Sequence, residues 1–426
     1  MAVLTNWTLK TSGTVMPDET LPAGQTIVLG LQHVVAMFGA TALAPILMGF
    51  DPNVSIFFSG IATLLFFVIT GGQLPSYLGS SFAFIAVVSA ATGHAVAAGP
   101  NPRIGLALGG IVACGALYAL IGLIVDRVGH AWVERLMPPV VTGAIVAAIG
   151  LNLAPIAVKG ISGGGLTTFM GLFTIVAVAV VATYTRGSLA RLPILIGAGI
   201  AYLLYVLLTN VAGLGKAIDF ASIANAAWFG LPNFTAPVFD SKAMVLIAPV
   251  AVILVAENLG HIKGIAAMTG RNLDPLIGKG FMADGVATMI SGSGGGTGVT
   301  TYAENMGVMA VTRVFSTLVF VVAGLVAILL GFSPKFGALI QTIPGPVLGG
   351  LSVVVFGLIA ATAGRIWVEA KVDFSNPRNL LTVGTALVLG AGDFSLSLGG
   401  FTMGGIGTAT FGAILLYHLM REPAVD

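Results

Sequence analysis

Two glutamates, Glu257 and Glu304, lie inside apolar stretches of a 426-residue chain in which only 8% of the residues are charged. A carboxylate in a membrane interior costs at least a few kcal/mol, so the acids found there usually serve binding, ion coupling or proton relay. His261 follows Glu257 by four residues, which places both side chains on one face of a helix. Two acids and an imidazole in this setting predict a transporter.

Each ionisable residue also has a structural explanation that the sequence leaves open. Glu257 could lie near a helix end and reach water, and His261 could be a surface or a merely packed imidazole. Glu304 could form an ion pair with an arginine. His33, alone in an apolar run, is explained equally well by a structural hydrogen bond and by substrate contact. We expect Asp284, at the start of a short apolar run, to cap a helix rather than to bind a ligand.

The ligand that best suits two carboxylates, a histidine and free backbone amides is a planar heterocycle. Its ring N–H groups would donate to the carboxylates, and its carbonyls would accept from the amides. An anion would fit poorly beside two acids. Burial and a neighbouring carboxylate both favour a protonated acid, so one glutamate could carry a proton. Proton-driven symport is therefore the hypothesis, and sodium coordination by the same oxygens stays open.

These side chains must be positioned by a membrane protein, because 57% of the residues are hydrophobic and the mean hydropathy is +1.02. A helix needs about 20 residues to cross roughly 30 Å of hydrocarbon. We therefore expect an all-α polytopic membrane protein with fourteen transmembrane segments. Their predicted cores are 26–48, 53–71, 75–92, 104–126, 137–156, 166–184, 191–213, 244–261, 280–293, 299–312, 313–332, 343–362, 379–395 and 403–420.

The distribution of Lys and Arg predicts the orientation. With the N-terminus in the cytoplasm, thirteen of the eighteen fall inside and five outside, which agrees with the positive-inside rule. Both termini are then cytoplasmic, and residues 1–20 are expected to be a tail without a signal sequence. Cys114 is alone in an apolar run, which excludes an internal disulfide and a cysteine-based metal site. No metal, cofactor or nucleic-acid partner is expected.

Three matches in the same order along the chain indicate an internal repeat. Residues 59–65 resemble 284–290, residues 80–84 resemble 300–304, and the glycines and proline of 139–150 recur in 346–357. Seven spans in each repeat would make the second inverted relative to the first. Inverted repeats bind their substrate near the middle of the membrane, between broken helices.

Segments 71–84 and 291–305 are the predicted breaks, in spans 3 and 10. Both are rich in Gly, Ser, Thr and β-forming residues, and irregular backbone survives at membrane depth only inside protein or beside a cavity. We expect two half-helices and two short strands to meet at a polar pocket, with the amides near Phe82 and Ala303 as donors. The alternative is that the glycines of 291–298 only permit close helix packing.

Four runs carry a resemblance to a known family: QHVVAMFGATALAPIL (32–47), PSYLGSSFAFIAVV (75–88), AENLGH (256–261) and TTYAENMGVMAVTRV (300–314). They are similar to the nucleobase–ascorbate transporter family, and specifically to its uracil permease branch, from about residue 20 to 420. The resemblance implies proton-coupled uptake, an elevator-like motion and a homodimer in the inner membrane. It also implies a core domain of spans 1–4 and 8–11 (21–130 and 241–335) and a gate domain of spans 5–7 and 12–14 (131–240 and 336–420), followed by a short cytoplasmic tail, 421–426.

The resemblance implies a role for individual residues as well. Glu257 and Glu304 match the substrate-binding glutamates, and Phe82 and Ala303 match positions whose main-chain amides contact uracil. His261 matches a histidine linked to proton coupling, in which Glu257 is also expected to take part. The supporting residues are expected to be His33, Gln32, Ser81 and Tyr302.

Two positions depart from the uracil permease pattern. Asn258 stands where a histidine is usual and is expected to face away from the pocket. Ala303 replaces a glycine, and its methyl group could shift the preference among uracil, thymine and other small pyrimidines. Purine members more often carry Gln in place of Glu304, so a pyrimidine is favoured over xanthine or urate.

Proteins of other classes fit less well. An anion exchanger on the same architecture would lack carboxylates at its site, and a channel would need no acid pair in an inverted repeat. The sequence has no nucleophile motif, metal cluster or phosphate-binding loop, so an enzyme is not expected.

Overall fold

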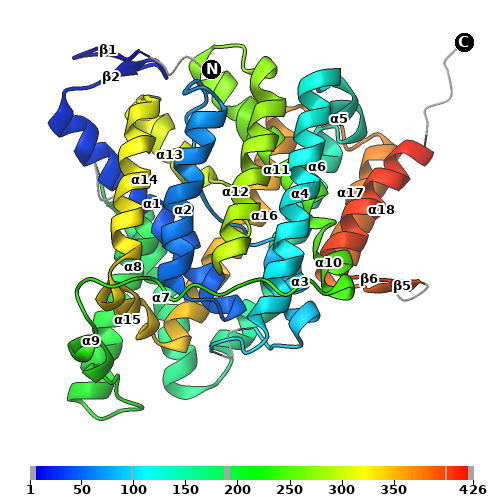
Figure 1. Cartoon of the computed structure of the whole chain (residues 1–426). Coiled ribbons are helices and arrows are strands. Elements are labelled where there is room, and N and C mark those ends of the chain that lie inside the picture. The colour runs from blue at the N-terminus through cyan, green and yellow to red at the C-terminus, as the bar shows by residue number, and fades with distance from the viewer. Residues whose placement is uncertain (1–5, 97–98, 187–191, 399–400, 421–426) are drawn as a thin grey trace, which may run out of the picture.

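The structure is a computed structural model that describes residues 6–96, 99–186, 192–398 and 401–420. Helices dominate it (Figure 1). In the first half of the chain they are α1 (Ala23–Met48), α2 (Pro52–Ile69), α3 (Phe84–Thr92), α4 (Ile104–Val128), α5 (Ala131–Leu136), α6 (Pro139–Ile161), α7 (Gly165–Tyr184), α8 (Pro193–Val206) with a π-helical turn, η2 (Leu207–Val211), and α9 (Ala221–Asn225). In the second half they are α10 (Ser241–Ile247), α11 (Val250–Thr269), a 3-10 turn, η3 (Asp274–Leu276), α12 (Ile277–Gly294), α13 (Ala303–Thr312), α14 (Thr317–Gly331), α15 (Pro334–Gln341), α16 (Gly345–Glu369), α17 (Pro377–Ala391) and α18 (Gly405–Leu419).

Local sequence sets several of the helix ends. The Asp51 carboxylate accepts from the Asn53 amide and Pro52 takes the first position of α2, which is where proline is tolerated. Helices α1 and α11 end at Gly49 and Gly270, with φ of 77° and 67°, in the left-handed region that glycine adopts without strain. These stops set the lengths of the helices that lead to the site.

Within the described ranges, eight helices are long and apolar enough to cross a membrane, or nine if the bent pair α14 and α15 counts as one span. The chain is thus a multi-pass, almost entirely helical membrane protein. Every one of the fourteen predicted runs contains a helix, although those at 75–92 and 299–312 hold only the short helices α3 and α13. The short helices α5 and α15 lie at opposite ends of the molecule (Figure 1).

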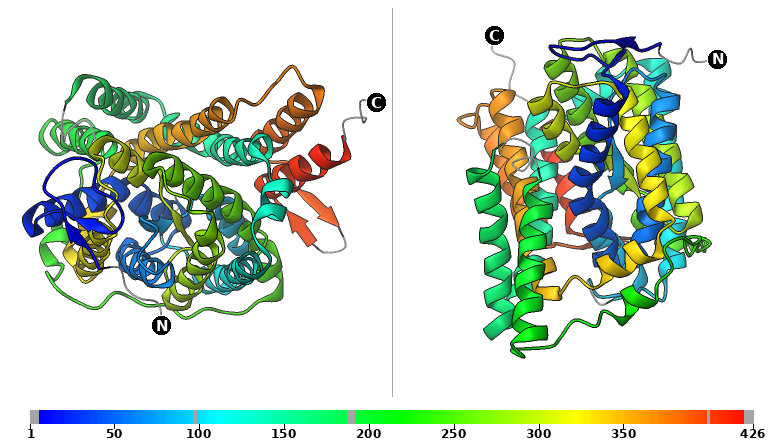
Figure 2. Two further views of the ribbon diagram at one scale, coloured as in Figure 1. Left: turned by 90° about the horizontal axis from the view of Figure 1, so that it is seen from above. Right: turned by 90° about the vertical axis from the view of Figure 1, so that its left-hand side faces the viewer.

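The helices pack in two groups that lie side by side when viewed from above (Figure 2). In the first, α4 packs on α12, α2 packs on α14, and α1, α3, α10, α11 and α13 complete the group. In the second, α6 packs on α16 and α17, α7 on α8, and α17 on α18. The first strand, β1 (Thr8–Leu9), and the C-terminal end of α18 lie at the same end of the molecule (Figures 1 and 2).

Two glycines at matching positions in the repeat make matching helix contacts. A Cβ atom on Gly60 of α2 would lie 2.4 Å from the Gly324 carbonyl oxygen in α14. A Cβ atom on Gly285 of α12 would lie 2.7 Å from the Gly115 carbonyl oxygen in α4. Gly60 and Gly285 occupy the same place in the matched sequences 59–65 and 284–290, so each half of the chain supplies the same close helix crossing.

The two expected strands in the broken segments are present. β3 (Leu78–Ser80) and β4 (Val299–Thr301) pair antiparallel, with Gly79 opposite Thr300. The second break is shorter than the sequence predicts, because α12 continues through Gly294 and turns only at Gly295, where φ is 102°.

Two further small sheets were not predicted. β1 (Thr8–Leu9) pairs in parallel with β2 (Glu19–Thr20), so residues 6–20 are folded onto the helices rather than forming only a tail. β5 (Leu396–Leu398) and β6 (Phe401–Met403) form an antiparallel pair ahead of α18.

Candidate functional site

A cavity of about 220 Å³ lies where β3, β4, α11 and α13 meet α8 and α16. Both predicted glutamates line it, together with Phe82, Ala303, Ser81 and Tyr302 from the predicted set. The remaining lining residues are Ser80, Ile194, Thr300, Thr301, Val355, Leu358, Ile359, Thr362 and Arg365. The cavity therefore lies between the two helix groups, and both groups contribute to its wall.

Glu257 is held in the middle of a helix. The chain breaks at Ala248 and Pro249, between α10 and α11, and Glu257 then falls in the third turn of α11. Twelve residues separate it from the end of α11 at Thr269, so its side chain is directed at the cavity rather than reaching water at a helix end.

Glu304 occupies the first turn of α13, directly after β4. Because Ala303 begins this helix, its amide has no carbonyl partner within the helix and is available as a donor. The positive end of the helix dipole also points toward the cavity, where it favours carbonyl and carboxylate oxygens. No ion pair joins Glu304 to an arginine among the described residues.

Phe82 lies between β3 and α3 and also lines the cavity. Its amide makes no backbone hydrogen bond within the described residues, whereas the neighbouring Ser81 amide donates to the Gly298 carbonyl at 2.9 Å. The Phe82 ring packs edge-on against Phe356 of α16, with ring centroids 5.6 Å apart. The aromatic ring thus contacts the second helix group while the amide remains available.

Tyr302 ties the two strands to α1. Its hydroxyl donates to the Ser80 carbonyl at 2.9 Å and accepts from Thr41 Oγ1 at 3.0 Å. Gly79 packs directly under the ring, since a Cβ atom there would lie 2.7 Å from Tyr302 Cε2. The supporting role predicted for Tyr302 therefore has a definite geometry.

His261 does not line the cavity but is joined to it through Thr301, from which a chain of polar contacts leads to buried residues. His261 Nδ1 lies 2.7 Å from Thr301 Oγ1, and Thr301 Oγ1 donates to Asn258 Oδ1 at 3.5 Å. With the hydrogen of the threonine hydroxyl assigned to Asn258, Nδ1 of His261 is assigned as the donor in the shorter contact. Asn258 Nδ2 in turn donates to Asp284 Oδ2 at 2.7 Å and to the Tyr118 hydroxyl at 3.0 Å. Asn258 faces away from the cavity, as the sequence predicts.

The prediction that Asp284 caps a helix is wrong. α12 begins at Ile277, seven residues earlier, so Asp284 lies about two turns inside the helix and is fully buried. Its Oδ2 atom is bound by Asn258, whereas Oδ1 has no hydrogen-bond partner among the described residues. The acidic side chain belongs to the buried network behind Glu257.

His33 does not line the cavity. Asn305 Nδ2 lies 2.9 Å from His33 Nδ1 and donates to the His33 carbonyl at 3.1 Å, and the imidazole packs on Phe320. The geometry favours the structural alternative, in which His33 fixes Asn305 and hence the start of α13. Gln32 is also absent from the cavity wall, and its amide nitrogen is buried without a partner among the described residues.

Sequence reasoning missed the contribution of α16. Thr362 and Arg365 face the cavity from the second helix group, with Val355, Leu358 and Ile359 beside them. Arg365 is one of the thirteen Lys and Arg residues that the sequence places inside, and no role in the site was predicted for it. Its spacing from Thr362 and Leu358, at three and seven residues, is the signal that puts all three on one helix face. No cluster of metal-ligating side chains occurs among the described residues.

Comparison with known proteins agrees with this architecture. Residues 24–399 match the family Xan_ur_permease, described as "Permease family". The chain belongs to this family of permeases, which are transporters and not enzymes. The resemblance carried by the sequence motifs is thereby confirmed.

Individual relatives share most of the chain. The protein is 64% identical over 425 residues to "Putative pyrimidine permease RutG" of Escherichia coli K12, covering 99% of this chain and 96% of the relative. It is 39% identical to the "Uracil permease" of the same organism, covering 95% and 94%, and 40% identical to the "Uracil permease" of Bacillus caldolyticus, covering 92% and 91%.

Solved structures share the fold at low sequence identity. The transmembrane domain of the cyanobacterial bicarbonate transporter BicA aligns with a TM-score of 0.66 at 18% identity, over 91% of this chain and 97% of that one. Murine Slc26a9, described as an anion transporter in the inward-facing state, aligns at 0.65 and 13% identity, over 96% of this chain and 69% of that one.

Proposed function

We propose that this protein is a proton-coupled symporter that imports uracil or a closely related pyrimidine. The observation that carries the proposal is the cavity itself, in which two carboxylates stand beside two available main-chain amides. The relatives named as uracil and pyrimidine permeases support the choice of substrate. The same donors and acceptors would also serve a purine, which makes xanthine the competitor to test.

Uracil matches the polarity of this wall. Its two ring N–H groups are donors for Glu257 and Glu304, and its two carbonyls are acceptors for the amides of Phe82 and Ala303. A volume of about 220 Å³ is below the roughly 300–1,000 Å³ of drug-sized pockets, which suits a single ring. An anion is disfavoured because Arg365 offers one positive charge against two carboxylates.

We assign proton coupling to Glu257 and His261. Two carboxylates in one site of low dielectric repel each other, and a proton on one of them removes this repulsion. Glu257 is the better carrier because its helix also presents His261, which is connected through Thr301 to the buried network. Glu304 then remains primarily a ligand.

The proposed transport mechanism is based on the position of the cavity between the two helix groups. We assign the group with α1–α4 and α10–α14 to the moving core and the group with α6–α8 and α16–α18 to the gate, in an elevator-like cycle. The Arg365 side chain is 63% exposed and lies one turn from the end of α16, which supports an opening of the cavity toward that end. With this end in the cytoplasm, as the distribution of Lys and Arg predicts, we assign this conformation to an inward-facing state.

The fourteen-span inverted repeat, the cytoplasmic termini and the homodimer belong to the same proposal. The matching glycine crossings and the strand pair β3–β4 support the repeat. Cysteine accessibility at the two termini tests their location, and light scattering in detergent tests the dimer.

The decisive experiment is uptake of labelled uracil by proteoliposomes with and without an inward proton gradient, in competition with thymine, xanthine and sulfate. We expect uptake that the gradient drives and that thymine blocks while xanthine and sulfate do not. Uptake that ignores the gradient would refute proton coupling. Absence of uracil uptake, or competition by xanthine or sulfate, would assign the glutamates to another ligand.

A further inference from the structure

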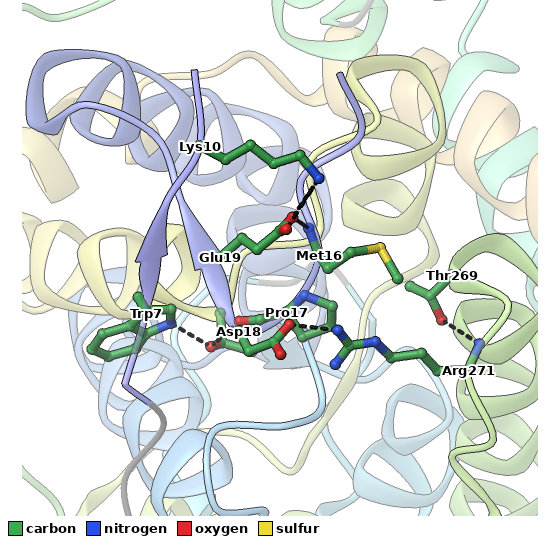
Figure 3. A network of polar contacts seen from close by, with 9 residues as sticks. Trp7, Lys10, Met16, Pro17, Asp18, Glu19, Thr269 and Arg271 are labelled. Atoms are coloured by element: carbon green, nitrogen blue, oxygen red, sulfur yellow. Dashed lines mark hydrogen bonds and ion pairs between the residues drawn. The ribbon is translucent and has the colours of Figure 1, made fainter. Parts of the chain in front are cut away.

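The segment that precedes α1 contacts the far ends of both helices that carry the site glutamates. The Val15 amide donates to the Arg313 carbonyl at 2.9 Å, and the Phe315 amide donates to the Val15 carbonyl at 2.8 Å, directly after α13 ends. The Asp18 carboxylate forms an ion pair with Arg271 Nη2 at 2.5 Å, just beyond the end of α11 (Figure 3).

We propose that residues 15–19 are a clasp that holds the ends of α11 and α13 together at the proposed cytoplasmic surface. Asp18 and Arg271 are then positioning residues for a site that they do not touch. The expected effect on uracil affinity rests on the proposed uracil site, whereas the role of the clasp in joining the ends of α11 and α13 does not.

Hydrogen bonds within the N-terminal segment fix the conformation of the clasp. The Glu19 amide donates to the Met16 carbonyl at 3.0 Å, and the Met16 amide donates to Glu19 Oε2 at 2.7 Å, so residues 16–19 close a tight turn. Lys10 binds both Glu19 oxygens, at 2.9 and 3.0 Å. The hydrogen bond from Lys10, followed by that from Met16, keeps the pKa of Glu19 below its ordinary value, so this carboxylate stays ionised near neutral pH.

The turn is also fixed to α14. The Thr317 amide and hydroxyl both donate to the Pro17 carbonyl, at 3.2 and 2.9 Å, and Trp7 Nε1 donates to Thr317 Oγ1 at 3.0 Å. The Trp7 ring stacks on Phe67 at the end of α2, with centroids 5.7 Å apart. Val15 is 1% exposed and packs with Val314 and Val319. The clasp therefore has a rigid base, and Asp18 projects from it toward α11.

Glu257 and Glu304 lie far enough from the clasp that a small tilt of α11 or α13 would displace their carboxylates. Glu257 is twelve residues before the end of α11, which at 1.5 Å per residue is about 18 Å. A tilt of about 5° over this length would move its carboxylate by about 1.5 Å, whereas binding groups need to be held within roughly 0.5 Å. Glu304 is eight residues from the end of α13, so the same tilt moves it less, by about 1 Å. Unequal displacement would change the separation of the two acids.

Two measurements on the purified full-length protein test the clasp. The first is hydrogen exchange in peptides covering 262–272 and 306–318, which needs no substrate. The second is the Kd for uracil. The variants are Asp18→Asn, the charge-swapped double variant Asp18→Arg with Arg271→Asp, and Val15→Pro, which removes the amide donor to Arg313. Asp373→Asn is the matched control, because Asp373 is in the loop after α16 and, among the described residues, its carboxylate accepts only from the amide and hydroxyl of Ser375 in that loop.

We expect Asp18→Asn to speed exchange in both peptides and to raise the Kd about two- to five-fold, the effect of a partly exposed ion pair. The charge-swapped double variant should restore the wild-type exchange rates and Kd. Val15→Pro should speed exchange most in the peptide covering 306–318. Unchanged exchange in Asp18→Asn, or faster exchange without any change in Kd, would overturn the proposal. If the wild type binds no uracil while exchange responds as expected, the substrate assignment fails and the clasp stands.

Discussion

Replacing Tyr302 by phenylalanine would remove a single hydroxyl that joins both broken segments to α1. Its partners, Ser80 and Thr41, are fully buried, and Tyr302 itself is 4% exposed, so water cannot replace the lost contacts. A buried partner left without its hydrogen bond costs ~1–3 kcal/mol. The Thr41 hydroxyl can instead donate to a carbonyl of its own helix, which reduces this free-energy cost for Thr41. The phenyl ring still fills the space over Gly79, so no cavity forms. We expect the free energy of unfolding to fall by about 2–4 kcal/mol.

Chemical unfolding of the purified protein in micelles, followed by circular dichroism, would measure this loss. Tyr205→Phe is the matched control, because the Tyr205 hydroxyl donates to the Lys216 carbonyl at 3.2 Å in an exposed position. The control should change stability by less than about 0.5 kcal/mol. If Tyr302→Phe is no less stable than this control, the argument that its hydroxyl holds the strands to α1 is refuted.

Three further substitutions test the assigned roles. Glu304→Gln should raise the Kd for uracil about 10- to 150-fold, the loss of one charged hydrogen bond worth ~1.5–3 kcal/mol, without lowering the yield of folded protein; wild-type affinity would remove Glu304 from the ligands. Glu257→Gln should flatten the pH dependence of uptake, since its proton is the one assigned to coupling, and an unchanged pH profile would exclude it. Phe82→Ala should weaken uracil binding less than Glu304→Gln because the proposed contact is main-chain; a greater loss would make the ring itself a ligand.

The sequence predicted the helices well for a physical reason. Hydropathy and length alone define a membrane helix, so runs such as 104–126 and 166–184 correspond closely to α4 and α7. The β3–β4 pair was predictable because helix-breaking residues at membrane depth need internal backbone partners. The packing of residues 6–20 was not, because it depends on backbone contacts such as that between Val15 and Arg313, which no side-chain pattern encodes.

The site was predictable to the extent that its residues are conspicuous in sequence. Glu257 and Glu304 stand out as charges in apolar runs, and the cavity contains both. Asp284 was misassigned because the polar start of α12, with Lys279 close by, resembles the water-facing end of a span. Arg365 was missed because only the packing of α16 against the strands determines that this cation lines the cavity.

The pairing of β3 with β4 also constrains how the protein can be made. The two strands are separated by about 220 residues, which a ribosome adds in roughly 10–45 s. Throughout this interval β3 is inserted without its partner, and lipid offers its backbone no hydrogen bonds. The first half of the nascent chain must therefore adopt a temporary arrangement, in which its own helices or the insertion machinery shield the backbone of β3 from lipid. The strand pair can form only when the tenth apolar run has left the ribosome, and the cavity is completed only when α16, in the twelfth run, has followed.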